Sequence, residues 1–114
     1  MDPIVQNAMT DALHRMWEKF LPEMIARVEV LESTNAALAA GHLTLTLRQE
    51  ANAAAHKLAG SLGTFGLTKG TILAREAEML YSSEPETDPA AAARLAQISA
   101  QLRKIVENRK EHQQ

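Results

Sequence analysis

The sequence predicts an all-α protein folded as an antiparallel up-down-up-down four-helix bundle. Apolar residues recur three or four positions apart in four segments, and no convincing two-residue alternation marks a β-strand. Only His42–Thr46 alternates, and it follows a glycine, so we interpret it as a connection. The length of 114 residues suits one domain with one core. Four amphipathic segments with short connections pack most simply as a bundle, so we treat residues 1–114 as one helical domain.

The first predicted helix covers residues 3–39. Asp2 and Pro3 form a typical start, because aspartate caps free backbone N–H groups and proline is tolerated in the first turn. Gly41 provides a natural stop. Pro22 lies inside the segment, where its ring collides with the carbonyl group four residues earlier. We therefore expect either one long helix kinked near Pro22 or two nearly collinear helices. The apolar face expected to be buried consists of Met9, Leu13, Met16, Phe20, Met24, Val28 and Leu31, widened by Trp17, Leu21 and Ile25.

Three shorter helices are predicted to follow, over residues 47–64, 69–82 and 89–109. Thr46 and Gln49 fit a capping box at the start of the second helix, and Thr68 can cap the third. Asp88 and Pro89 repeat the aspartate-proline start before the last helix. The buried face of the third helix is expected to consist of Ile72, Leu73, Ala77 and Leu80.

Composition and charge argue against several classes of protein. A net charge of -2 disfavours a nucleic-acid partner, because such domains need basic residues to neutralise phosphates. The absence of cysteine excludes disulfides and thiolate sites. No apolar run is long enough to span a bilayer, and no secretory signal opens the chain, so we expect a cytoplasmic protein with no membrane partner. The histidines share no metal-ligand spacing, so no metal site is expected.

The most informative segment is Ala53–Leu67, in the second predicted helix. Each residue of a helix turns about 100° from the last, so His56 lies opposite the apolar face, which should be buried. Glycines inside a helix cost about 1 kcal/mol each relative to alanine, and stability alone does not explain them here. The apolar face holds Leu47, Ala51, Ala54, Leu58, Leu62 and Phe65. The face of His56 holds Gln49, Asn52, Ala53, Ala59, Gly60 and Gly63.

An exposed histidine among small residues fits nucleophilic chemistry. A neutral imidazole is a nucleophile near pH 7, and the missing side chains would let a bulky group reach the ring of His56. Lys57 lies about 100° around the helix, from which it could neutralise anionic oxygens. Phosphoryl transfer depends chiefly on positioning and charge neutralisation. Gln49 and Asn52 are candidates for hydrogen bonds to the ring or to phosphoryl oxygens.

The segment reads His56-Lys57-Leu58-Ala59-Gly60-Ser61 and continues to Gly63 and Gly66. It resembles the signature of histidine-containing phosphotransfer (HPt) domains, in which leucine follows the histidine by two residues and glycines follow by four and about ten. The resemblance implies a phosphorelay intermediate: His56 accepts a phosphoryl group from a receiver-domain aspartyl phosphate and passes it to another receiver. Implied partners are response-regulator receivers and a sensor histidine kinase. It also implies no cofactor on this chain, since Mg²⁺ belongs to the receiver, and the sequence has no ATP-binding motif.

One position departs from the family pattern. HPt domains commonly carry lysine three residues after the histidine, where this chain has Ala59. Lys57 is often basic in the family, and we expect it to supply the charge, helped by Lys69 from the start of the next helix. The protein would then be a phosphotransfer carrier rather than a turnover enzyme.

A second interpretation is an interaction module without chemistry. In that case the small-residue patch of Ala53, Ala59, Gly60 and Gly63 docks another helix, because close approach of helices favours small residues. Such a patch predicts a dimer that breaks on Gly60→Leu, whereas an HPt domain is expected to be monomeric. A third interpretation, a cofactor bundle with His56 and either His14 or a methionine as axial ligands, conflicts with an outward-facing His56.

Overall fold

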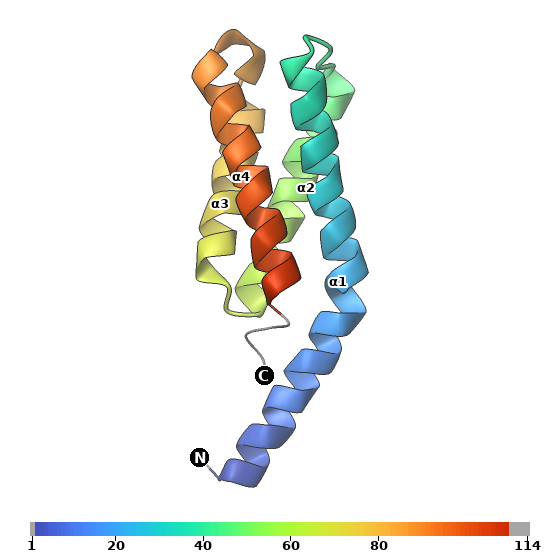
Figure 1. The fold of residues 1–114 in the computed structure, drawn as a ribbon, viewed down its shortest axis with the longest axis vertical. Helices are drawn as coiled ribbons and strands as arrows, with labels where there is room; N and C mark the ends of the chain where they lie inside the picture. The colour runs from blue at the N-terminus through green and yellow to red at the C-terminus, as the bar shows by residue number, and fades with distance from the viewer. Residues whose placement is uncertain (1, 110–114) are drawn as a thin grey trace.

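The computed structural model describes residues 2–109, which form four α-helices and one short 3-10 helix. These are α1 (Pro3–Ala39), α2 (Leu45–Thr64), α3 (Thr68–Ser82), η1 (Pro85–Thr87) and α4 (Pro89–Asn108). The described residues contain no strand. Successive helices run in opposite directions and lie side by side (Figure 1), so the predicted all-α four-helix bundle is confirmed. The predicted domain limits of 1–114 extend beyond the described residues and stay a prediction.

Local signals at the helix ends behave as predicted. The carboxylates of Asp2 and Asp88 each accept a hydrogen bond from the backbone N–H two residues later, at 2.9 and 3.0 Å. Gly41 and Gly66 have φ of +75° and +73°, which glycine adopts without steric cost. At both glycines the N–H of the next residue reaches the carbonyl five positions earlier, which closes a Schellman motif.

Two predicted helix starts are wrong by one or two residues. α2 begins at Leu45, because Thr44 rather than Thr46 is its cap: Thr44 Oγ1 accepts a hydrogen bond from the N–H of Leu47 at 3.1 Å. α3 begins at Thr68 itself, and its cap residue makes no side-chain hydrogen bond. Thr44 and Thr46 are equally suitable N-cap residues by type. The path of the chain before α2 decides which of them has the extended backbone that an N-cap needs.

Helix α1 is continuous across Pro22, which selects a single helix of 37 residues over two separate ones. Its N-terminal part reaches well below the other three helices and runs at an angle to the part inside the bundle (Figure 1). We call residues 3–16 the overhang. A kink located at Pro22 itself stays a prediction. The molecule accordingly measures 54 × 21 × 20 Å along its principal axes.

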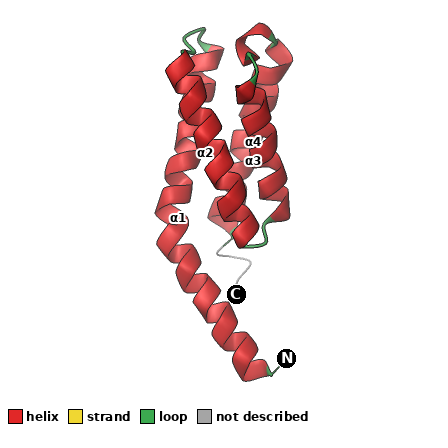
Figure 2. Cartoon of the chain, turned by 180° about the vertical axis from the view of Figure 1, so that it is seen from behind, coloured by secondary structure: helices red, strands yellow, loops and turns green. Residues whose placement is uncertain are grey.

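The core lies between the four helices, which Figure 2 shows from behind. Its largest fully buried side chains include Trp17, Met24, Val28, Leu31, Leu58, Leu62, Tyr81, Leu95, Ile98 and Leu102. The expectation of a buried face along all of α1 is wrong for Met9, Leu13, Met16 and Phe20, which are exposed. Met9, Leu13 and Met16 belong to the overhang, which the other helices do not reach (Figure 1), whereas Phe20 follows the buried Trp17.

The predicted burial of Ile72 is also wrong, since it is 61% exposed. The buried face of α3 runs through Gly70, Leu73, Ala77 and Tyr81, which leaves Ile72 on the outside. Close packing at Gly70 accounts for which face of α3 is buried. A Cβ at Gly70 would lie 2.9 Å from Leu62 Cδ1 of α2 and 3.4 Å from Ile105 Cγ2 of α4. The start of α3 therefore packs closely against both neighbours, and a side chain at position 70 would require the end of the Leu62 side chain to shift.

Candidate functional site

His56 lies on the solvent side of α2, next to α3. Its side chain is 73% exposed, whereas Leu58 and Leu62 are fully buried. The helical wheel therefore placed the ring and the core face correctly. The elements that hold it are the two most extensively packed helices of the bundle, α2 and α3, joined by the turn at Gly66.

A carboxylate on α3 orients the His56 ring. His56 Nδ1 lies 2.8 Å from Glu78 Oε2, and the Glu78 side chain is 29% exposed. An ionised carboxylate only accepts hydrogen bonds, so in the neutral ring the proton resides on Nδ1. Nε2 then carries the free lone pair, and no described residue forms a hydrogen bond to it. No sequence motif marks Glu78 for this role.

Asn52 and Ser82 fix the turn of α3 that carries Glu78. Asn52 Nδ2 donates to the Glu78 carbonyl oxygen and to Ser82 Oγ, each at 2.8 Å. Ser82 Oγ donates to the same carbonyl at 2.8 Å. Asn52 is thus bound to α3 and not to the imidazole, and within this structure its role is to position Glu78. Gln49, one turn earlier, is exposed.

The small-residue patch is narrower than predicted. Ala53, Gly60 and Gly63 are exposed, but Ala59 is only 5% exposed, so its expected place on the open face is wrong. Ala59 lies against α3, where its carbonyl accepts a hydrogen bond from Thr71 Oγ1 at 3.3 Å. A Cβ at Gly60 would meet no atom within 4 Å. The bundle itself therefore does not require glycine at position 60.

The two lysines of the predicted site lie in different places. Lys57 is exposed and directly follows His56. Lys69 is also exposed, but it lies in the first turn of α3, nine residues before Glu78 and about 14 Å away along the helix axis. The structure therefore brings Lys57 next to the histidine and does not bring Lys69 there.

Other kinds of site are not found in residues 2–109. No three His, Asp or Glu side chains in that range are grouped so that they could hold a metal ion. None of the described helices is long and apolar enough to cross a membrane.

The structure is a four-helix bundle with an exposed histidine on its second helix, which is the arrangement expected of a histidine phosphotransfer domain. The family model of the Hpt domain matches residues 15–112, and the chain belongs to that family. It accordingly has a histidine phosphotransfer role in two-component signalling.

A curated relative supports the assignment. Protein RcaC of Microchaete diplosiphon is 28% identical over 96 residues, which is 84% of this chain. The match spans 15% of the length of RcaC. No solved structure matches the chain.

Proposed function

We propose that this chain is a phosphorelay intermediate. His56 Nε2 accepts a phosphoryl group from an aspartyl phosphate of a response-regulator receiver and passes it to the aspartate of another receiver; a sensor histidine kinase is a further expected partner. The observation that carries the proposal is the exposed imidazole whose Nδ1 is bound to Glu78, because this leaves Nε2 as the nucleophile. We expect the chain to work as a monomer in the cytoplasm.

The transfer step follows from the ring geometry. The Nε2 lone pair attacks phosphorus, an N–P bond forms, and the P–O bond to the aspartyl carboxylate breaks, so that the carboxylate leaves with the electron pair. Nδ1 keeps its proton, and the Glu78 carboxylate stabilises the positive charge that develops on the ring. Lys57 neutralises phosphoryl oxygens. In the onward step a receiver carboxylate attacks phosphorus and His56 recovers its lone pair.

The open surface beside His56 supports docking of a receiver. Gly60 has free space where a side chain would stand, and Ala53 and Gly63 are exposed on the same side of α2. A receiver could therefore bring its aspartate to the ring without moving bundle side chains. Gln49 would lie at the edge of the same surface. The alternative of an interaction module without chemistry gives no role to the bond between His56 and Glu78.

A labelled receiver tests the proposal. Wild type incubated with a ³²P-phosphorylated receiver should acquire an acid-labile label, and His56→Gln should not. His42→Gln is the matched control, because His42 is also exposed but lies in the connection before α2. His56→Gln should melt close to wild type, since an exposed ring makes few packing contacts. Label retained by His56→Gln would refute the assignment.

The same assay measures the contribution of Glu78. Glu78→Gln should slow transfer by about 10- to 100-fold, as loss of groups that orient a reactive imidazole typically does. Glu50→Gln, an exposed carboxylate on α2, should leave the rate unchanged. An unchanged rate in Glu78→Gln would show that the ring needs no orientation by α3.

A further inference from the structure

A line of four polar side chains runs along the side of α3 that adjoins α2. The residues are three or four positions apart, so they lie one above another on the helix. They are Thr71, Arg75, Glu78 and Ser82. Three of the four form hydrogen bonds to residues of α2. Arg75 is the exception, since it is exposed and forms no ion pair with a residue in the range 2–109.

The bonds made by its neighbours give the level of Arg75 along α2. Thr71 Oγ1 donates to the Ala59 carbonyl oxygen at 3.3 Å, and Glu78 Oε2 lies 2.8 Å from His56 Nδ1. Arg75 lies between Thr71 and Glu78, and the two helices are antiparallel, so it adjoins the turn of α2 from His56 to Ala59. It is three residues from Glu78, about 4.5 Å along the helix axis. The long arginine side chain can span that distance.

Gly60 leaves the space beside the imidazole open. It follows His56 by four residues, so it lies on the same face of α2. A Cβ at Gly60 would meet no atom within 4 Å, so packing of the bundle does not explain the glycine. A group bound to His56 Nε2 and the guanidinium of Arg75 can both occupy this space. The glycine thus keeps open the place where the two side chains could share a ligand.

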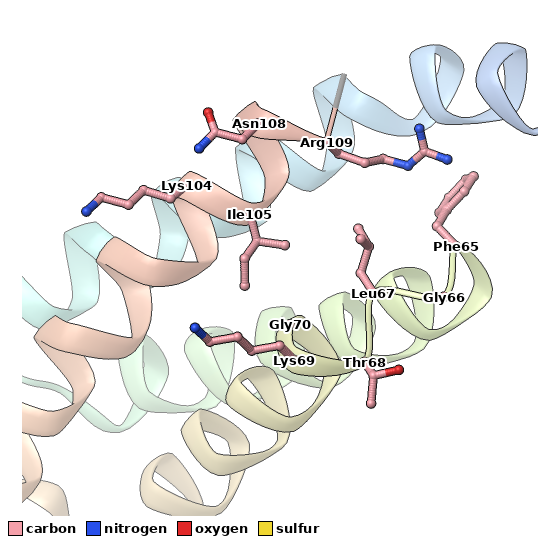
Figure 3. Close-up of a pocket in the computed structure, with 10 residues that line it drawn as sticks. All are labelled: Phe65, Gly66, Leu67, Thr68, Lys69, Gly70, Lys104, Ile105, Asn108 and Arg109. Carbon is pink, nitrogen blue, oxygen red and sulfur yellow. The ribbon is translucent and has the colours of Figure 1, made fainter. Parts of the chain in front are cut away.

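The other cationic residue of α3, Lys69, lies on the α4 side of the helix. It lines a cavity of about 420 Å³ together with Lys104 and Ile105 of α4 (Figure 3). It is also six residues before Arg75, about 9 Å farther from His56 along the axis. Arg75 is therefore the cationic residue of α3 that is placed beside the histidine.

We propose that Arg75 binds the phosphoryl group during its transfer to and from His56, an inference that rests on the proposed function. Its planar guanidinium donates paired N–H groups to two phosphoryl oxygens. Ala59 lies about 60° from His56 around α2, on the α3 side, and Lys57 lies about 100° in the opposite direction. Arg75 and Lys57 therefore approach the phosphoryl group from opposite sides. Arg75 supplies from α3 a charge that the buried Ala59 cannot supply from α2.

Labelling rates with two donors, a ³²P-phosphorylated receiver and ³²P-phosphoramidate, test the role of Arg75 in the full chain. With phosphoramidate, His56 Nε2 attacks phosphorus, the P–N bond of the donor breaks, and the nitrogen takes a proton from water and leaves as ammonia. Arg75→Ala should slow labelling at least about five-fold with both donors, by loss of charge-assisted hydrogen bonds. Arg75→Lys should recover most of that loss, because it keeps the charge. Both variants should melt close to wild type, since Arg75 is exposed.

Lys104→Ala is the matched control, because it removes one exposed positive charge from α4 and should leave both rates unchanged. Equal slowing by Lys104→Ala and Arg75→Ala would overturn the inference, as would a wild-type rate in Arg75→Ala. A loss seen with the receiver but not with phosphoramidate would also overturn it, since Arg75 would then contact the receiver. Each of these results leaves the proposed function intact, provided that wild type is labelled at His56. Wild type that takes no label from either donor would refute the proposed function and this inference together.

Discussion

The two halves of α1 have the same apolar periodicity and opposite surroundings. In the overhang, Ile4, Met9 and Leu13 are 78%, 51% and 41% exposed. In the half inside the bundle, Met24 and Val28 are completely buried. The reason is length: 37 residues of helix extend about 55 Å, whereas the 20 residues of α2 or α4 extend about 30 Å.

The difference shows what an amphipathic pattern can establish. It identifies a face that would gain free energy from burial, but it carries no information on whether the same chain supplies the covering surface. Trp17 marks the boundary in this molecule. Its ring packs edge-on against Phe65 at the end of α2, with a centroid distance of 5.0 Å. N-terminal to Trp17 the stripe continues without a partner among the described residues.

The largest expected difference between the halves comes from a matched pair of leucines. Leu31→Ala should lower the free energy of unfolding by about 2–5 kcal/mol, because Leu31 is 1% exposed and its removal leaves a cavity. Leu13→Ala should change it by no more than about 0.5 kcal/mol, because Leu13 is 41% exposed. Urea denaturation measures both values. Equal losses would mean that the overhang is covered in solution.

A smaller difference is expected from two asparagines. Asn35 Nδ2 donates to the Leu95 carbonyl at 3.0 Å and to Ser99 Oγ at 2.9 Å, and Asn35 Oδ1 accepts from the Tyr81 hydroxyl. Burial raises the pKa of Tyr81, which keeps this hydroxyl protonated as a donor. Asn35→Ala should cost about 1–3 kcal/mol, since it leaves partners on two other helices unsatisfied.

Asn7→Ala in the overhang is the control for Asn35 and should stay within about 0.5 kcal/mol of wild type, because Asn7 is exposed. Urea denaturation measures the free energy of unfolding of both asparagine variants. A loss for Asn35→Ala as small as that for Asn7→Ala would show that the hydrogen bonds to α3 and α4 contribute no net stability.

The smallest effect concerns the pH dependence of stability. Arg103 of α4 forms two hydrogen bonds of 2.7 Å to Glu32, which lower the pKa of that carboxyl below its usual 4.5. A carboxyl whose pKa is depressed by folding stabilises the protein above its unfolded pKa, and this contribution is lost as the pH falls through the folded value. Arg103→Gln should therefore reduce stability at about pH 7 and converge with wild type at about pH 3.

The overhang offers the control for that ion pair. Arg15→Gln removes an exposed positive charge from the overhang and should leave the pH dependence of unfolding unchanged. Free energies of unfolding at several pH values measure the pH dependence of both variants and of wild type. A constant difference between Arg103→Gln and wild type across this range would exclude Glu32 as the titrating partner.

Features that depend on neighbours in the sequence were predicted well. The four helices, the aspartate caps and the glycine stop at Gly41 all follow from short-range rules, because capping and backbone conformation are local. The exposure of His56 followed from the wheel for the same reason. Thr44 and Thr46 show the limit of such rules, since both have the chemistry of a cap and only the path of the chain selects one.

Features that depend on packing were missed. Ala59 was predicted on the open face, but α2 contacts both α1 and α3, and its buried arc extends as far around the helix as Ala59. Glu78 lies 22 residues from His56 and carries no motif. A signal for it existed: in an antiparallel hairpin, residues equidistant from the turn face each other, and both residues are equally far from Leu67. Asn52 and Ser82 obey the same symmetry.

Gly70 connects the packing of this hairpin to its chemistry. A Cβ at this position would lie 2.9 Å from Leu62 Cδ1 of α2, so that side chain would have to shift, and His56 and Glu78 are carried by the same two helices. Helices are stiff over the distance of about 12 Å that separates Gly70 from Glu78 along α3. The close packing at one end of the hairpin therefore contributes to the spacing at which the imidazole meets its carboxylate at the other.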